Sequence, residues 1–196
     1  RNIGINPHQR ATWELAQSVQ NVALKYNLNP PTVICVYHTS YQQDKLGRLK
    51  EYTPQNFMSK KEDWMIESYG LYNLPVESFL QELNSNELID VITETIVPEI
   101  ASRLGQDISP ESTAIIGASM GGLTTIYAAI QKPDFFRTAL SFSPHWVIGG
   151  DSLARKMMSE FPEPGKHKLW MSRGTKGLDA LYEGPQDLAD VLIKSR

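Results

Sequence analysis

One stretch decides the fold expected of this chain: Thr113-Ala114-Ile115-Ile116-Gly117-Ala118-Ser119-Met120-Gly121-Gly122. An apolar, β-branched run ends at a glycine, and the apolar residues over 123–130 that follow have helical character. We therefore predict a buried strand, a tight turn and a helix in direct succession. Glycines two positions before and after Ser119 suit this turn, because a side chain at either position is expected to collide with the neighbouring strand or helix.

Gly117, Ser119 and Gly121 form the pattern G-x-S-x-G, in which a sharp strand-to-helix turn lifts a serine hydroxyl clear of the sheet. The N-terminal N–H groups of the following helix point to the same place and favour a developing negative charge there. This arrangement suits a serine that attacks an acyl carbon. The alternative interpretation is a glycine-rich turn that only lets a helix pack closely on a sheet.

Composition limits the classes of protein to which the chain can belong. Its 196 residues, 41% of them hydrophobic, suffice for a full core, and we predict a single domain over 1–196. The net charge is −3 and no long charged run occurs, so neither nucleic acid nor an anionic membrane surface is an expected partner. The single cysteine, Cys35, excludes an intrachain disulfide framework and is expected to be a buried, inert thiol.

The sequence also bears on location and on bound groups. No apolar stretch approaches the roughly 18 residues of a membrane span, and no signal peptide opens the chain, so a cytoplasmic location is expected. Arg1 is not a natural start, which leaves a removed leader or an absent segment open. No cluster of His, Cys, Asp and Glu has metal-ligand spacing, and no glycine motif for nucleotides occurs, so no metal and no cofactor are expected.

Apolar runs alternate with helical periodicities along the chain. Strands are expected over 32–38, 113–116, 137–142 and 167–172, with helices over 11–26, 75–104, 123–130, 151–160 and 186–194. This alternation is typical of an α/β protein with a doubly wound, mostly parallel sheet and helices on both faces. Residues 39–75 are polar and irregular, and they form either a packed connector or the wall of a pocket.

Further segments accompany the serine turn: Pro133-Asp134-x-Phe136, Ser141-x-Ser143-Pro144, Arg48-x-x-Glu51-Tyr52-Thr53-Pro54 and Gly174-Thr175-x-x-Leu178-Asp179-x-Leu181-Tyr182. With residues 117–123 they resemble the putative esterase family of α/β-hydrolases, which includes enterochelin, esterase D-type and feruloyl esterases and mycolyltransferases. The resemblance runs from about Trp13 to Tyr182. It implies an α/β-hydrolase fold and a small-molecule ester as substrate, without specifying which ester.

The resemblance implies a catalytic triad in the chain order serine, acid, histidine. Ser119 matches the nucleophile, and the backbone N–H of Met120 matches one donor of the oxyanion hole. Asp179 lies where the acid is expected; Glu183 is the substitute, and a helix-capping or surface carboxylate is the alternative role of Asp179. Three further residues are candidates for the pocket, namely His145, Trp146 and Tyr52.

No histidine follows Asp179, where the resemblance places the base; the four histidines are His8, His38, His145 and His167. Either the sequence is a segment of a longer hydrolase that lacks elements at both ends, or it is a binding module that has lost its base. His145 replaces the base only if its loop folds over Ser119. Acyl transfer uses the same triad and stays open, and missing strands would expose sheet edges and favour a homo-oligomer.

Overall fold

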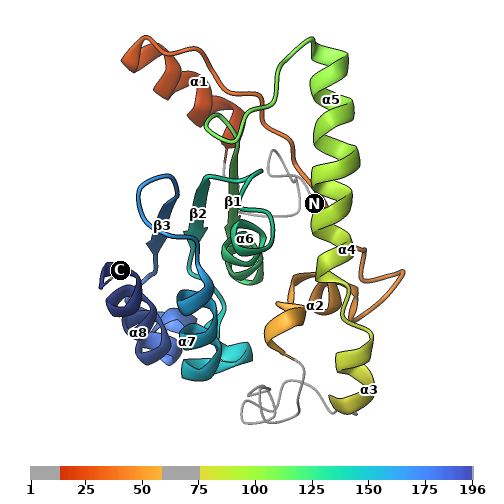
Figure 1. The fold of residues 1–196 in the computed structure, drawn as a ribbon, viewed down its shortest axis with the longest axis vertical. Coiled ribbons are helices and arrows are strands. Elements are labelled where there is room, and N and C mark those ends of the chain that lie inside the picture. The colour runs from red at the N-terminus through yellow and green to blue at the C-terminus, as the bar shows by residue number, and fades with distance from the viewer. Residues whose placement is uncertain (1–13, 59–75, 196) are drawn as a thin grey trace. The chain divides into compact units, whose positions relative to one another are not determined.

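The computed structural model describes residues 14–58 and 76–195, and the chain divides into two compact parts, residues 1–38 and 39–196 (Figure 1). In the first part, the described residues form one helix, α1 (Leu15–Tyr26), which ends where Asn27 takes a left-handed backbone conformation. Trp13, the first residue of the family resemblance, lies outside the described residues. The helix is therefore confirmed over the part of 11–26 that the structure describes.

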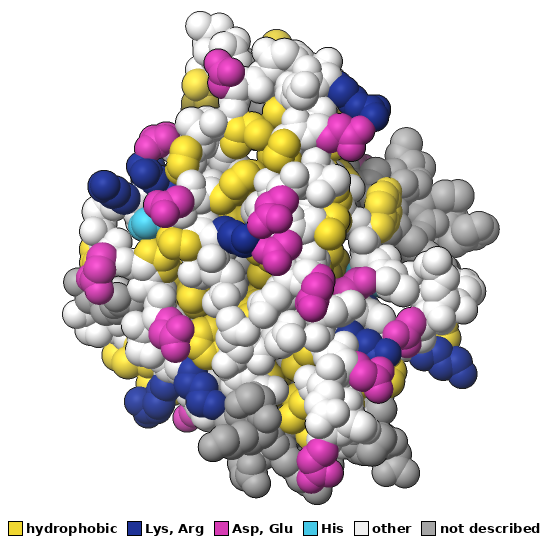
Figure 2. All heavy atoms as spheres, turned by 45° about the vertical axis from the view of Figure 1, so that its right-hand side comes forward, with side chains coloured by type: hydrophobic (Ala, Val, Ile, Leu, Met, Phe, Trp, Pro, Cys, Tyr) yellow, Lys and Arg dark blue, Asp and Glu magenta, His cyan; other side chains and the backbone are white. Residues whose placement is uncertain are grey.

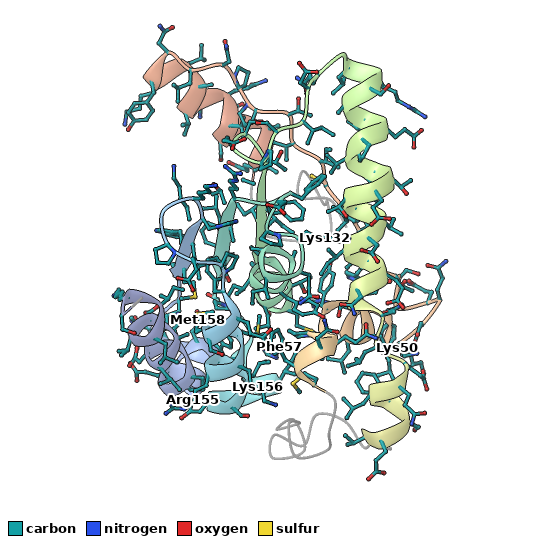
Figure 3. All side chains as sticks on the ribbon, viewed as in Figure 1. Lys50, Phe57, Lys132, Arg155, Lys156 and Met158 are labelled. Atoms are coloured by element: carbon teal, nitrogen blue, oxygen red, sulfur yellow. The ribbon has the colours of Figure 1, made fainter. Side chains whose placement is uncertain are left out.

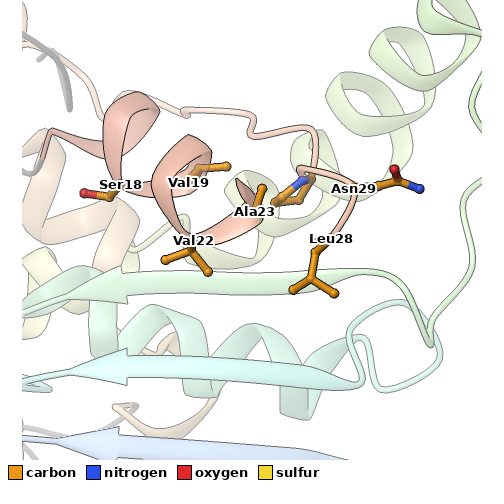
Figure 4. Close-up of a pocket in the computed structure, with 7 residues that line it drawn as sticks. Ser18, Val19, Val22, Ala23, Leu28 and Asn29 are labelled. Carbon is orange, nitrogen blue, oxygen red and sulfur yellow. The ribbon is translucent and has the colours of Figure 1, made fainter. Parts of the chain in front are cut away.

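Two sequence predictions about residues 32–38 are wrong. These residues form no strand, and Cys35 is exposed rather than buried. An extended apolar run becomes a strand only through hydrogen bonds to a neighbouring strand, which a local pattern cannot supply. The same part of the chain holds a small apolar cavity of about 260 Å³, which Val19, Val22, Ala23 and Leu28 help to line (Figure 4).

The second part is built on a parallel sheet of three strands in the order β1 (Ala114–Ala118), β2 (Thr138–Phe142) and β3 (Lys168–Ser172) (Figure 1). The register pairs Ala118 with Phe142 and Phe142 with Ser172, so the carboxyl ends of the three strands are level. The α/β class with a parallel sheet is confirmed. Ligands of open α/β sheets bind beyond this carboxyl edge, which directs attention to the loops that start there.

The helix α6 (Met120–Gln131) follows β1 directly and packs on β1 and β2. Its residues Leu123, Ile126 and Tyr127 are fully buried, as the apolar run over 123–130 predicts. β1 itself is an edge strand among the described residues, and Ile116 keeps 48% of its surface exposed. The expectation of a buried strand is therefore wrong among the described residues: no residue of β1 is fully buried, and Ile115 packs only partly buried against the core. Ile116, the next residue, points to the opposite face, because side chains alternate along a strand.

Three helices and one π-helical turn occupy residues 76–104. They are α3 (Val76–Gln81), α4 (Ser85–Asp90), η4 (Val91–Ile96) and α5 (Val97–Leu104). The expected helix over 75–104 is interrupted between α3 and α4, and from Ser85 onward the helical backbone is continuous (Figure 1). Pro98 has no N–H to donate to the carbonyl four residues back, which accounts for the wide turn just before it. Gly105 ends the helix with a φ of 63°.

The remaining elements of the second part are short or lie near the C-terminus. They are α2 (Gly47–Tyr52), η1 (Gln55–Phe57), η5 (Trp146–Ile148), α7 (Gly150–Glu160), η6 (Gly177–Tyr182) and α8 (Glu183–Lys194). α7 and α8 pack against each other, and Lys156 of α7 donates to the carbonyl of Phe57 at 3.3 Å (Figure 3). The described residues of 39–75 thus carry short elements of their own. Residues 59–75, a candidate pocket wall, lie outside the described residues.

The buried Tyr127 of α6 is hydrogen-bonded to the segment over 39–58 and to α4. The hydroxyl of Tyr127 donates to Asn86 Oδ1 at 2.5 Å and accepts from the backbone N–H of Asn56 at 3.1 Å. Burial raises the pKa of Tyr127 to about 12, so the hydroxyl keeps its proton throughout the physiological range. Lys132, at the end of α6, adds ion pairs to Asp90 at 2.6 Å and to Glu94 at 3.1 Å (Figure 3).

Lysine and arginine side chains are interspersed with aspartate and glutamate on the face that Figure 2 shows, and no field of one sign covers it. Among residues 14–58 and 76–195, no helix combines the length and the apolar composition that crossing a bilayer requires.

Replacing Tyr127 by phenylalanine should lower the free energy of unfolding by about 1 kcal/mol, because the backbone N–H of Asn56 and the side-chain amide of Asn86 lose their shared partner, the buried tyrosine hydroxyl. Urea unfolding of Tyr127→Phe beside Tyr41→Phe measures this loss. Tyr41 is 66% exposed and should change by less than about 0.5 kcal/mol. Equal midpoints for the two variants would contradict the role given to the Tyr127 hydroxyl.

Candidate active site

The backbone of Ser119 is the central feature of the carboxyl edge. Its φ of 57° and ψ of −123° are unusual for a residue other than glycine. Three hydrogen bonds hold it: Ser119 N donates to Phe142 O at 2.9 Å, and Ser119 O accepts from Leu123 N at 3.2 Å and from His145 N at 3.1 Å. A strained backbone persists only where its surroundings fix it in this way. The sharp turn from strand to helix is therefore present at the predicted serine.

The glycines around Ser119 have unequal roles. A Cβ atom on Gly117 would lie 2.3 Å from the carbonyl oxygen of Gly121, and one on Gly122 would lie 2.9 Å from the carbonyl oxygen of Phe142. A Cβ on Gly121 would meet no described atom within 4 Å. The predicted collision thus occurs before the serine, but after it the crowded position is Gly122 rather than Gly121. Which glycine faces the sheet depends on the rotation of α6 about its axis.

The hydroxyl of Ser119 is accessible. The residue is only partly buried, and within the described parts of the chain its Oγ makes no hydrogen bond. Met120 is the first residue of α6, so its backbone N–H has no partner within the helix, while its side chain is buried in the core. The turn thus places a hydroxyl beside the N-terminus of a helix of 12 residues, whose dipole favours negative charge.

Asp179 lies in the loop region after β3 and is held by two donors. Ser143 Oγ donates to Asp179 Oδ2 at 2.9 Å, and Gly174 N donates to the same oxygen at 2.6 Å. Ser143 directly follows β2, and its own N–H donates to Ser172 O at 2.6 Å. The loops after β2 and β3 are thereby joined at the carboxyl edge of the sheet.

Glu183, the substitute for the acid, has a different environment. Its carboxylate accepts from Arg173 at 3.1 Å, and Arg173 also pairs with Asp187 at 2.9 Å. Glu183 is exposed and belongs to this surface ion-pair cluster. Asp179 is the one of the two acids whose side chain contacts the loop after β2.

His145 lies beside the turn, since its backbone N–H donates to Ser119 O. Its imidazole is half-buried, and this burial lowers its pKa, with a further contribution from the positive charge of Arg48. The neighbouring Trp146 is fully buried, and its Nε1 donates to Gln186 Oε1 at 3.0 Å, so it anchors this loop to α8.

Tyr52, the third candidate for the pocket, lies at the end of α2. Its carbonyl accepts from Thr124 Oγ1 at 3.1 Å, which ties α2 to α6. Burial raises the pKa of the Tyr52 hydroxyl, and the positive charge of Arg48 acts in the opposite direction. Arg48 therefore influences both Tyr52 and His145, and these two side chains share its electrostatic environment.

Of the remaining histidines, His167 is the one that the structure describes in the second part of the chain. His167 precedes β3 and thus lies at the amino edge of the sheet, where its Nε2 contacts the carbonyl of Pro133 at 2.9 Å. His38 belongs to the first part of the chain, and His8 lies outside the described residues. In the portions that the structure covers, no group of three or more His, Cys, Asp or Glu side chains is arranged to hold a metal.

Ser143 and Gly174 are the contacts that sequence reasoning missed. Both occur in segments quoted for the family resemblance, but no pattern in the sequence pairs either of them with Asp179. The backbone φ of Ser143 is 45°, which is a second uncommon conformation at the same edge.

A comparison with protein-family models matches residues 52–179, more than half of the chain, to the family described as "Putative esterase". The matched range begins at Tyr52 and ends at Asp179, so it includes the serine turn and all three strands. No curated protein matches the chain.

The close approach at Gly117 can be tested by substitution. Gly117→Ala should lower the free energy of unfolding by about 2–3 kcal/mol, because its Cβ would overlap a backbone oxygen that cannot move freely. Gly121→Ala, the matched control, should leave stability unchanged or raise it slightly, since alanine favours a helix. Thermal and urea unfolding measure both. A Gly117→Ala protein as stable as Gly121→Ala would contradict this packing of the turn.

His145 should make stability depend on pH. Because its pKa in the folded state lies below the ordinary value of about 6.5, the unfolded chain binds the proton more tightly. Its contribution is complete above that value and is lost as the pH falls below it. Between pH 7.5 and pH 5, the melting temperature of His145→Gln should therefore fall less than that of the unmodified protein. Equal losses would show that the imidazole titrates normally.

Proposed function

Because the chain belongs to the putative esterase family, we propose that it carries the nucleophile of a serine esterase, with Ser119 forming an acyl-enzyme from a small-molecule carboxylic ester. One observation carries the proposal: the strained backbone of Ser119 at the carboxyl end of β1, with a hydroxyl that is accessible and bonds to no described residue. The family match, which includes this turn, supports the same reaction class.

In the proposed reaction, the Ser119 hydroxyl gives its proton to an imidazole while Oγ attacks the carbonyl carbon of the ester. The carbonyl oxygen becomes an oxyanion, which accepts from the N–H of Met120 at the start of α6. One such donor typically contributes about 3–4 kcal/mol. The bond to the leaving oxygen then breaks, and the alcohol departs with the proton from the imidazolium. Water repeats these steps on the acyl-enzyme, releases the acid and restores Ser119.

Asp179 is the proposed acid that orients the imidazole. Its position in the loop region after β3 and its bonds to the loop after β2 support this role over that of Glu183, which is committed to a surface ion pair. The family resemblance implies a base that follows the acid in the chain, and no histidine follows Asp179, so we assign the base to a histidine outside these 196 residues. His145, which contacts the Ser119 backbone, is proposed to line the pocket.

The pocket wall is proposed to come from α2 and from the loop after β2. Tyr52 is tied to α6 through Thr124, and His145 is tied to Ser119 itself, so both are fixed with respect to the nucleophile. Arg48 is exposed on α2 and affects both of them electrostatically. Loops set the substrate on folds of this kind, so differences here are expected to decide which ester is accepted.

Hydrolysis of p-nitrophenyl esters by the full-length protein tests the proposal. Ser119→Ala should lower kcat by at least about 10³-fold, because the nucleophile of a triad cannot be replaced by water at a similar rate. Ser112→Ala, an exposed serine just before β1, is the control and should retain full activity.

Two further measurements separate the alternatives. Activity that persists in Ser119→Ala would place the nucleophile elsewhere, and a full-length protein with no activity on any ester would indicate a binding module. A loss in His145→Gln as large as that in Ser119→Ala would make His145 the base. Addition of an alcohol distinguishes hydrolysis, which yields only the acid, from acyl transfer, which yields a new ester.

A further inference from the structure

The two hydrogen bonds to Asp179 have an unusual distribution, because both end on the same oxygen. Ser143 Oγ and Gly174 N each donate to Oδ2, at 2.9 Å and 2.6 Å. Among the residues that the structure describes, Oδ1 accepts no hydrogen bond. The carboxylate is therefore fixed through one oxygen while the other is available to a further donor.

Neither donor belongs to the helical segment η6 that contains Asp179. Ser143 comes from the loop after β2, 36 residues earlier in the chain, and Gly174 from the loop after β3. A carboxylate that only capped its own helix would accept from the N–H groups at the start of that helix. These bonds instead tie Asp179 to the carboxyl edge of the sheet, because Ser143 follows the end of β2 and Gly174 follows the end of β3.

Ser143 is itself rigidly placed. Its backbone has a φ of 45°, and its N–H donates to Ser172 O at 2.6 Å, so it bridges the ends of β2 and β3. A serine in the left-handed region gives up some stability relative to glycine. A serine differs from a glycine by its Cβ and its hydroxyl. The hydroxyl of Ser143 donates a hydrogen bond to Asp179.

Gly174 makes room for the carboxylate. A Cβ atom at this position would lie 2.6 Å from Asp179 Oδ2. The backbone of Gly174 is not in the left-handed region, so an alanine is compatible with its conformation. An alanine at 174 would therefore require the Asp179 carboxylate to shift from its present position.

We propose that Ser143 is a positioning residue, which together with the Gly174 N–H holds Asp179 Oδ2 so that Oδ1 accepts the hydrogen bond from the imidazole of the catalytic base. This inference rests on the proposed function. Two donors on one oxygen resist rotation of the carboxylate, which would exchange its oxygens and turn Oδ1 away. The imidazole then meets an acceptor that is already oriented, which is the arrangement that catalysis by a triad requires.

The test uses the full-length protein with three variants and two controls. Ser143→Gly removes the hydroxyl and suits the positive φ, Ser143→Ala removes it without that relief, and Gly174→Ala pushes on Oδ2. Ser159→Ala removes an exposed hydroxyl from α7, and Gly184→Ala adds a methyl group that meets no described atom within 4 Å. Melting temperatures establish that each variant is folded.

We expect kcat for a p-nitrophenyl ester to fall about 10- to 100-fold in all three variants, with KM within about twofold and both controls unchanged. A carboxylate that is oriented toward the imidazole stabilises its protonated form and raises its pKa. In the variants, the acidic limb of the pH profile of kcat/KM should therefore move to lower pH. A role in folding alone would not move this limb.

The outcomes separate the inference from the function on which it rests. Wild-type kcat and an unmoved acidic limb in Ser143→Gly and Gly174→Ala overturn the positioning role while the esterase proposal stands. A wild-type protein that hydrolyses no ester overturns both. Lower kcat with an unmoved limb also counts against the inference, because orientation of the base is then unaffected.

Discussion

The structure depends on how the backbone of Ser119 is fixed between strand β1 and helix α6. The bonds from Ser119 N to Phe142 O and from His145 N to Ser119 O join this turn to the end of β2 and to the loop after it. A residue with a φ of 57° would otherwise relax toward an ordinary conformation. The position of the Ser119 hydroxyl therefore depends on β2 and on the loop after it, as well as on the turn itself.

The same edge gathers the other groups of the proposed site. Level strand ends place Ser143 after β2 and Gly174 after β3, and both donate to one oxygen of Asp179. On the other side of α6, the bond from Thr124 to Tyr52 and the buried hydroxyl of Tyr127 secure the segment over 39–58. Polar contacts over long sequence separations, added to an apolar core, thus determine which side chains can meet a substrate.

Sequence reasoning succeeded where the structure is local. A β-branched run, a glycine and an apolar helix specify the turn at Ser119, and the helix expected over 75–104 ends at the same residue as α5. It failed where the outcome depends on a distant partner: residues 32–38 have strand-like composition but form no strand, and Cys35 is exposed. The crowding at Gly122 in place of Gly121 depends on how α6 is rotated against β2.

For the candidate site, the G-x-S-x-G pattern named the serine, and the family resemblance named the acid through its place after the serine in the chain. The contact of Ser143 with Asp179 was not predictable, since it spans 36 residues and depends on the pairing of β2 with β3. The same limit applies to Trp146, whose indole bonds to Gln186, 40 residues later.

The central claim is that the hydroxyl of Ser119 is the nucleophile. The most direct measurement is mass-spectrometric mapping of the full-length protein after reaction with a fluorophosphonate, which phosphonylates an activated serine. The tryptic peptide over 104–137, which continues past Lys132 because proline follows it, contains Ser109, Ser112 and Ser119, and fragmentation distinguishes them. The account predicts one phosphonyl group, located on Ser119. An adduct on any other residue, or an unmodified peptide from protein that still hydrolyses esters, contradicts it.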